Sequence, residues 1–455
     1  MESNITKILS KFVEETTFEK LPKRDIDRMK MIILETIGCM VLGSQNTTGK
    51  TLRKAIKTIG GNEEATVFGT NLKTSPQNAA LINGSMGHHY EYDDGISSAM
   101  GLHAGIAITP AAIAIGETIR ASGKEIICAM IVGYEIACRI GRAIAGMEGY
   151  RTMHSTVLLG SFGATVASCK LLGLGLNRIS NAIGICGSLN SITPFESFIG
   201  GAMVKDMYGG WPSFYGSFVA LLAQCGVTGL LNILQAKLGF FQVITGGKYN
   251  RSELIDGLGK NYVWTDGHYF KPHAACRAVH LVADCIYNIK KKERINIEKI
   301  KDIIVIAKPE IVSLARGGAK PKNDIQAKVS VHYSIAAALI LRGNHLSIDT
   351  YKDEYLHDPK ILNLAKKVRV VSSSGSKVFH IHGHGPVEII ITFKDGTFCR
   401  GVFNKERSLE IEKIPNKFKE LTLNVFPEKK ILQIINLVSE LEKIEDIRLL
   451  TKFLV

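Results

Sequence analysis

Apolar residues recur at helical spacing through most of the first 265 residues. Ile5, Ile8, Leu9 and Phe12 fall on one face of a helix, and the stretch 26–42 repeats the same period. Long segments rich in alanine, glycine and isoleucine follow, with no strong alternation of strand type between them. The pattern therefore predicts a large helical region, whose later helices are expected at 106–119, 125–144, 156–172 and 213–234.

The pattern changes near Tyr262. Runs rich in β-branched residues now appear, and one of them is followed by a Lys-Asp-Gly-Thr turn that is typical of a hairpin. These runs predict strands at 300–307, 368–372 and 387–393, with helical segments at 276–288 and 333–341 between them. From about residue 408 the chain becomes helical again, and 431–441 is clearly amphipathic.

These elements predict an α+β fold with two domains. Residues 1–266 would form a large all-helical domain, completed by C-terminal helices within 403–455. Residues 267–402 would form a smaller α+β domain. We expect the C-terminal helices to pack back onto the first domain.

The net charge of +14 raises the question of an anionic partner. The densest basic run comprises Lys290, Lys291, Lys292 and Arg294, and it lacks interleaved aromatic residues. We interpret it as a solvated helix end and expect no nucleic-acid partner. The nine cysteines are odd in number, and no CxxC pair occurs. Such usage is typical of a reduced, cytoplasmic protein and argues against an iron–sulfur cluster.

One segment resembles a membrane span. Residues 213–234 carry no charge, and about 20 apolar residues suffice to cross a bilayer. However, the segment contains Ser213, Gln224 and several glycines, and no basic cluster flanks it. We expect a buried helix there and no membrane association. The N-terminal stretch 1–17 carries acids and no long apolar core, so it is not expected to be a signal peptide.

Two motifs are weak. Residues 43–51 resemble a phosphate-binding loop, but five residues separate the glycines where that loop needs four. His380, His382 and His384 alternate on a predicted strand and could share a metal, although no carboxylate or cysteine lies close in sequence. We interpret them as surface or interface histidines.

The segment 83–110 carries the most informative chemistry. Glu91, Asp93 and Asp94 precede a loop, and His103 follows immediately before a long apolar helix. Neighbouring carboxylates raise one another's pKa and can orient a histidine for acid/base work. The same residues are also compatible with a solvated helix end and an incidental histidine. A metal site formed by His88, His89 and the acids is a third option.

Three further patches place polar groups in glycine-rich or apolar surroundings. His154 leads into the segment 160–164, and Lys205 follows a Gly-Gly pair. The segment 271–277 begins the second region with Lys271 and ends with Arg277. A single such lysine is often a surface residue, but two lysines beside His and Arg would suit a carboxylate ligand.

Taken together, the order and spacing of these patches resemble the MmgE/PrpD family. This family includes 2-methylcitrate dehydratases, cis-aconitate decarboxylases and an iminodisuccinate epimerase. The matching features are the Asn-Gly and acid-rich segment 83–94, His103 before the apolar helix, His154, Lys205, the KPYPxCR-like segment 271–277 with His280 after it, and Tyr333 before an alanine-rich helix.

This chain departs from the family pattern at several positions. Glu91 stands where the family usually has Asp, Gly95 and Ile96 where Thr or His commonly follows the acid pair, and Ala104 where Pro is usual. Trp211 and Pro212 intervene after the Lys205 loop, and the usual Asn-Pro segment near the C-terminus is missing. These departures bear on the substrate more than on the fold.

The resemblance implies that the α+β domain is a lid and that the active site lies in the cleft beneath it. His103 and His154 would be the acid/base pair, oriented or tuned by Asp93 and Glu91, with Tyr333 as a further catalytic candidate. The implied substrate-binding residues are Lys205, Lys271, Arg277 and His280.

The resemblance implies a metal-independent lyase that has no cofactor and forms a homodimer. It would act on a small polycarboxylate by elimination or decarboxylation at a carbon next to a carboxylate. Two alternatives remain. One is an epimerase of an amino- or imino-dicarboxylate that uses the same site, and the other is a non-catalytic helical binding protein.

Overall fold

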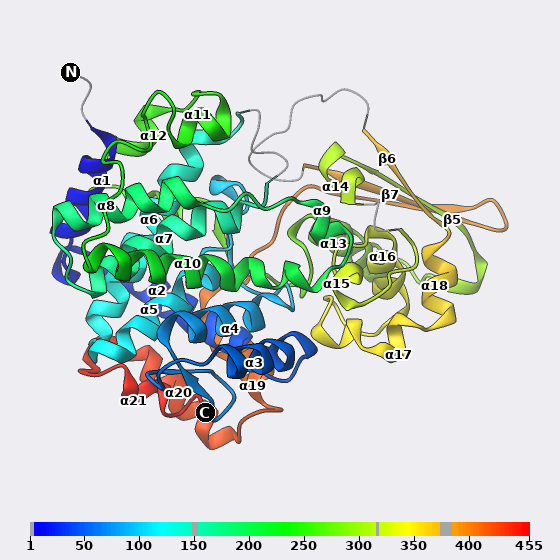
Figure 1. Cartoon of the computed structure of the whole chain (residues 1–455). Helices are drawn as coiled ribbons and strands as arrows, with labels where there is room; N and C mark the ends of the chain where they lie inside the picture. The colour runs from blue at the N-terminus through cyan, green and yellow to red at the C-terminus, as the bar shows by residue number, and fades with distance from the viewer. Residues whose placement is uncertain (1–3, 148–152, 315–317, 374–384) are drawn as a thin grey trace.

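The computed structural model describes residues 4–147, 153–314, 318–373 and 385–455. Helices make up one side of the molecule, and a four-stranded sheet with its own helices makes up the other (Figure 1). The main helices of the first side are α1 (Ile5–Glu15), α2 (Lys23–Gly43), α3 (Thr47–Ile59), α4 (Pro76–His88), α5 (Ala104–Ile119), α6 (Gly123–Ile144), α7 (Ser155–Leu171), α8 (Leu176–Leu189) and α10 (Met207–Gln224).

The centre of this helical part is formed by α5, α6 and α7, which are buried along almost their whole length. Small residues allow these helices to approach closely. A Cβ atom on Gly133 of α6 would lie 2.7 Å from the carbonyl oxygen of Gly163 in α7. Ser122 begins α6 with a capping box, in which its side chain and that of Glu125 bind each other's backbone N–H groups.

Helices α4 and α10 pack backbone against backbone, and this contact matters for the site. A Cβ atom on Gly84 would lie 2.7 Å from Cα of Gly210, and one on Gly209 would lie 2.7 Å from the carbonyl oxygen of Gly84. Larger residues would force the two helices apart. The glycines therefore bring the end of α4 next to the turn that begins α10.

The second part contains a mixed sheet of strand order β6–β5–β7–β8. Its strands are β5 (Ile300–Ala307), β6 (Val368–Ser372), β7 (Val387–Phe393) and β8 (Phe398–Phe403). β6 runs parallel to β5, and the other two pairings are antiparallel. Ile303, Val305 and Ile389 are buried, whereas their neighbours along the strands are partly exposed. The helices α13 (Arg277–Lys292) and α16 (Val331–Ile340) contact the sheet, and α18 (Pro359–Ala365) packs on α16.

The end of the chain returns to the helical part. The helices α19 (Ile414–Thr422) and α20 (Glu428–Ser439) pack against α2, and the short α21 (Arg448–Thr451) follows α20 (Figure 1). Ile414 and Phe418 are fully buried in the same apolar core as α1, α2 and α5–α7. A second core lies between the sheet and α13 and α16. The domain limits given above remain a prediction.

The predicted fold class is confirmed, and the three predicted strands have the bounds of β5, β6 and β7. The predicted helix 213–234 is wrong at both ends, because α10 begins at Met207 and ends at Gln224. Gly226 follows with φ of 99°, a left-handed conformation in which the helix cannot continue. Nowhere in the described ranges does a helix have the length and apolar character needed to cross a membrane. His380, His382 and His384 lie outside the described residues.

Candidate active site

The acid segment forms a tight turn at the end of α4. Glu91 adopts a left-handed backbone conformation with φ of 51°, which is uncommon for a residue other than glycine. Beyond the turn, β3 (Gly95–Ile96) pairs with β4 (His268–Tyr269) in antiparallel fashion. This pairing brings the segment that contains Lys271 next to the acid turn, although 180 positions separate Lys271 from Glu91.

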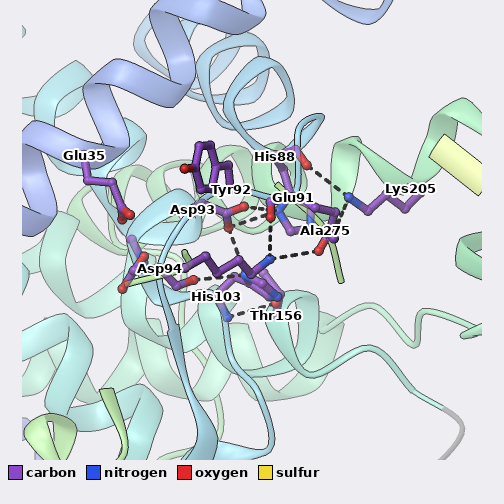
Figure 2. Close-up of polar contacts among 12 residues, drawn as sticks. Glu35, His88, Glu91, Tyr92, Asp93, Asp94, His103, Thr156, Lys205 and Ala275 are labelled. Carbon is purple, nitrogen blue, oxygen red and sulfur yellow. Dashed lines mark hydrogen bonds and ion pairs between the residues drawn. The ribbon is translucent and has the colours of Figure 1, made fainter. Parts of the chain in front are cut away.

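Asp93 lies between two histidines. Its Oδ2 atom is 2.9 Å from Nδ1 of His103 and 3.1 Å from Nδ1 of His88 (Figure 2). Nδ1 of His103 also lies 3.0 Å from the carbonyl oxygen of Asp94, and the backbone N–H of His103 donates to Oγ1 of Thr156. Because Nδ1 is held in this way, proton exchange between His103 and a ligand would use Nε2.

The pKa values of this group follow from burial and pairing. Burial by itself would raise the pKa of Asp93, but His88 and His103 hold that pKa well below its ordinary value. Burial lowers the pKa of His88, and the nearby Lys205 lowers it further, against the opposing effect of Asp93. Asp93 is thus an anion that can orient His103, while His88 favours its neutral form.

Glu91 binds two buried lysines. Its carboxylate forms ion pairs with Nζ of Lys205 and, at 2.9 Å, with Nζ of Lys271. Each lysine also donates to a backbone carbonyl, Lys205 to that of His88 and Lys271 to that of Glu91, both at 3.0 Å. Burial opposes the charge on Glu91, but Lys205 and Lys271 hold its pKa well below the ordinary value. A lysine ammonium has three donors, and these contacts use two of them on each lysine.

Asp94 faces the other way and supports the start of α5. Its Oδ1 atom accepts the backbone N–H of Gly105 at 3.1 Å, and its Oδ2 atom accepts the hydroxyl of Tyr134 at 3.0 Å. Nε2 of His268 lies 3.2 Å from the same Oδ2 atom. A side chain on Gly105 would collide with Asp94, so this glycine is required for the contact. The arrangement fixes the backbone on which His103 stands.

His154 immediately precedes α7, as the sequence predicted, and its ring is buried. The ring centroid lies 6.4 Å from that of His103, with an interplanar angle of 19°, and 4.8 Å from that of Tyr208. Its Nδ1 atom has no hydrogen-bond partner among the described residues. Burial lowers the pKa of His154 well below its ordinary value, and the nearby His88 and His103 act in the same direction. His154 is therefore a neutral imidazole near His103.

The other predicted residues, Tyr333, Arg277 and His280, have contacts in the described structure that do not involve Asp93 or Glu91. The hydroxyl of Tyr333 donates to the carbonyl oxygen of Thr350 at 2.8 Å, within the second core. Arg277 forms an ion pair with Glu406 at 3.0 Å, and Nε2 of His280 lies 3.0 Å from the carbonyl oxygen of Ala275. The predicted roles of Tyr333, Arg277 and His280 therefore remain predictions.

Two buried lysines were missed by the sequence reasoning. Lys417 of α19 binds Glu35 at 2.5 Å and the carbonyl oxygen of Tyr92 at 2.7 Å. Lys328 binds the carbonyl oxygen of His89 at 2.9 Å. Together with Lys205 and Lys271, they place four ammonium groups on carbonyls of the acid turn. A signal existed for Lys417, because it lies within the apolar stripe of α19, whose other members are Ile414, Phe418 and Leu421.

One departure from the family pattern has a structural reason. A Cβ atom on Gly95 would collide with the hydroxyl group of Tyr269, which faces it across the β3–β4 pair. This hydroxyl is buried and has no hydrogen-bond partner among the described residues, and burial raises the pKa of Tyr269 to about 12. The space that a threonine would need at position 95 is therefore filled by the tyrosine ring.

The metal alternative combined His88 and His89 with the acids, whereas the one set of donors in the described part of the chain comprises His88, Asp93 and His103, without His89. Potential ligand atoms of His88, Asp93 and His103 all lie within 4.8 Å of one another. The carboxylate already accepts from both imidazoles, and the ammonium groups of Lys205 and Lys271 lie on the adjacent Glu91. A divalent cation there would compete with these contacts and would be repelled by the lysines.

The chain combines a helical N-terminal part, a mixed-sheet C-terminal part and a buried centre of histidines, lysines and carboxylates. These three features together define its class, which the comparison with known families identifies. Residues 7–252 match the MmgE/PrpD N-terminal domain and residues 273–443 match the MmgE/PrpD C-terminal domain, so the chain belongs to the MmgE/PrpD family.

Relatives resemble the chain over nearly its whole length. It is 27% identical to the cis-aconitate decarboxylase-like protein oryM of Aspergillus oryzae, over 98% of this chain and 96% of that protein. It is 27% identical to the cis-aconitate decarboxylase of Aspergillus terreus, over 100% of this chain and 96% of that enzyme. The cis-aconitate decarboxylase of Mus musculus is 24% identical, over 100% and 94% respectively.

Proposed function

We propose that this protein is a metal-independent lyase that acts on a small polycarboxylate, with cis-aconitate as the first substrate to test. The observation that carries the proposal is the Asp93–His103 pair beside the two lysines on Glu91. It combines an oriented acid/base group with cationic donors in a buried site. The names of the relatives support the same substrate class.

The proposed chemistry uses each group in a different way. Lys205 and Lys271 bind substrate carboxylates through their remaining N–H donors. In a decarboxylation, the bond to one carboxylate breaks and its electron pair passes to the adjacent carbon. The remaining carboxylates, held by the lysines, help to stabilise this carbanion-like species. A proton from an acid/base group, His103 in our proposal, then completes the product.

His154 gives the proposal a second acid/base group. Its neutral ring lies 6.4 Å from the ring of His103. Two such groups would also suit an epimerase that removes a proton from one face of an amino- or imino-dicarboxylate and returns it to the other. We therefore retain this second candidate function. It differs from the first in leaving the carbon skeleton intact.

A screen by NMR in heavy water tests the proposal. The purified protein is incubated with tricarboxylates and with C4 amino-dicarboxylates. A lyase consumes its substrate, and a decarboxylase also releases carbon dioxide and places one deuterium in the product. Deuterium exchange with an unchanged carbon skeleton would indicate the epimerase. If no compound shows turnover or exchange, the result contradicts both the lyase and the epimerase and favours the non-catalytic binding protein.

We also propose that the protein is a cytoplasmic homodimer. Many of its exposed large apolar side chains occur in one stretch of the chain, which would suit an interface between two copies. Sedimentation velocity would test the assembly, and a monomer at micromolar concentration would contradict it. These side chains are Leu189, Ile192, Met203, Val204, Phe218, Val227, Leu230, Leu231, Leu238 and Val243.

A further inference from the structure

His89 connects two carboxylates that come from distant parts of the chain. Its Nδ1 atom lies 2.7 Å from Oδ2 of Asp206, and its Nε2 atom lies 2.8 Å from Oδ2 of Asp324. Both carboxylates act as acceptors. Burial would raise the pKa of each, but His89 and the nearby lysines outweigh it, so both pKa values lie below their ordinary range. Each ring nitrogen of His89 therefore faces a carboxylate oxygen at hydrogen-bond distance.

Further contacts hold Asp206, Asp324 and the backbone of His89 in place. Oγ1 of Thr48 donates to Asp206 at 2.5 Å. Nζ of Lys328 binds Asp324 at 2.7 Å and the carbonyl oxygen of His89 at 2.9 Å. Asp206 is fully buried and Lys328 nearly so, while part of Asp324 reaches solvent. The network thus joins the end of α4, the start of α10 and the short helix α15 (Asp324–Ala327).

The network lies directly beside the lysine at the proposed substrate site. Two consecutive residues at the end of α4 contact two consecutive residues before α10. The carbonyl oxygen of His88 accepts from Lys205, and the ring of His89 binds Asp206. Lys205 itself lies in the 3-10 turn η4 (Met203–Lys205), a single turn of a kind whose hydrogen-bond geometry is poorer than that of an α-helix. The Asp206–His89 contact anchors this turn at the residue that follows Lys205.

We propose that His89 is a positioning residue, which holds Asp206 and thereby places the ammonium group of Lys205 for a substrate carboxylate. The inference rests on the proposed function, in which Lys205 binds substrate. The contact to Asp206 carries the positioning effect, whereas the contact to Asp324 ties this turn to the second part of the molecule. The two contacts use different ring nitrogens, so they can be removed separately.

Two neutral substitutions separate the contacts. In His89→Asn the amide nitrogen is as many bonds from Cβ as Nδ1, so it can still donate to Asp206. In His89→Gln the amide nitrogen corresponds to Nε2 and can donate to Asp324 instead. Both variants replace the imidazole with the same uncharged amide group. His357→Gln, at an exposed histidine in the turn after α17 (Asp353–Leu356), is the control for loss of a histidine elsewhere.

The measurements are crystal structures of both variants, together with KM and kcat on the substrate found by the screen. We expect Lys205 to keep its contacts with His88 and Glu91 in His89→Asn and to lose at least one in His89→Gln. KM should rise about tenfold or more in His89→Gln, as expected for one lost charge-assisted contact, with kcat changed much less. His89→Asn should show a clearly smaller rise, and His357→Gln none.

Thermal unfolding separates positioning from a general loss of stability. The two His89 variants should unfold at similar temperatures, although their KM values differ. An unmoved Lys205 in His89→Gln, or equal KM values in the two variants, would overturn the inference. If the wild-type protein turns over no polycarboxylate, the crystal structures still decide the matter. A Lys205 displaced in His89→Gln alone would then support the positioning role, while the proposed function would fail.

Discussion

Oδ2 of Asp93 lies 2.9 Å from Nδ1 of His103, and both side chains are buried. This contact fixes the orientation of an imidazole that stands immediately before the apolar helix α5. It also leaves Nε2 as the nitrogen that can exchange a proton with a ligand.

His103→Asn should lower turnover by roughly 10²–10⁴, the range expected for loss of one general acid/base group. Asparagine retains a hydrogen bond to the acid turn, so the variant should stay folded. The measurement is turnover on the substrate found by the screen, with circular dichroism to check the fold. His357→Asn is the matched control at an exposed position. A folded His103→Asn protein within about threefold of wild type would move the catalytic role to His154.

Lys271→Met should destabilise the protein strongly, because it leaves the carboxylate of Glu91 buried with less compensation. Breaking a buried ion pair in this way costs about 3–5 kcal/mol. Adding Glu91→Gln to the Lys271→Met variant should restore part of the lost stability, since the amide that replaces the carboxylate carries no charge. Urea unfolding of the two single variants and the double variant measures the coupling. Additive losses would show that the pair does not act as a unit, and Lys352→Met at an exposed ion pair should change stability little.

The free energy of unfolding should respond to the titration of Glu35. Burial raises the pKa of this carboxyl to about 8, despite the ion pair with Lys417. An unfolded chain releases the same proton at about pH 4.3. The stability contributed by protonated Glu35 is therefore complete below that value and is lost as the pH rises toward about 8.

Urea unfolding at about pH 5 and about pH 8, on either side of most of this window, tests the effect. Glu35→Gln removes the titrating group, so wild type should lose more stability than the variant between the two conditions. Other groups titrate in both proteins and cancel in the comparison. Equal changes in the two proteins would show that Glu35 remains ionised throughout this range.

Dialysis against a strong chelator should leave turnover unchanged. Asp93 already binds Nδ1 of both histidines, and the lysine ammonium groups on Glu91 oppose a divalent cation at that position. The measurement is turnover before and after dialysis, with the metal content of the protein determined in parallel. Activity that disappears and returns with one added metal would contradict the prediction.

Gly84→Ala should lower the free energy of unfolding by about 1–3 kcal/mol, as for other overpacked contacts. The added Cβ would lie 2.7 Å from Cα of Gly210 and push α4 away from α10. Substrate affinity should also fall, because this contact brings His88 to Lys205. Gly175→Ala is the control, since its Cβ would meet only Glu14, at 3.5 Å. Equal stability of the two variants would show that the helices can separate without cost.

The sequence by itself determined the elements and many of the chemical groups of the site. The spacing of apolar residues predicted β5, β6 and β7 and most of α5, α6 and α7, because the periodicity of a buried face is a local property. The acid turn, His103, His154, Lys205 and Lys271 were also found, since they stand in short segments of unusual composition. Local patterns could not show that α10 ends at Gln224, where the charge-free stretch continues.

Only the tertiary structure decided which groups meet. Lys417 binds Glu35 across 382 positions, and Lys328 reaches the carbonyl oxygen of His89 across 239. Such contacts depend on how closely helices and turns approach one another, and the glycines between α4 and α10 set that distance. For the same reason, the carboxylates of Glu91 and Asp93 bind different partners. One carboxylate lies where two lysines converge, and the other lies between two imidazoles, although a single residue separates them in the chain.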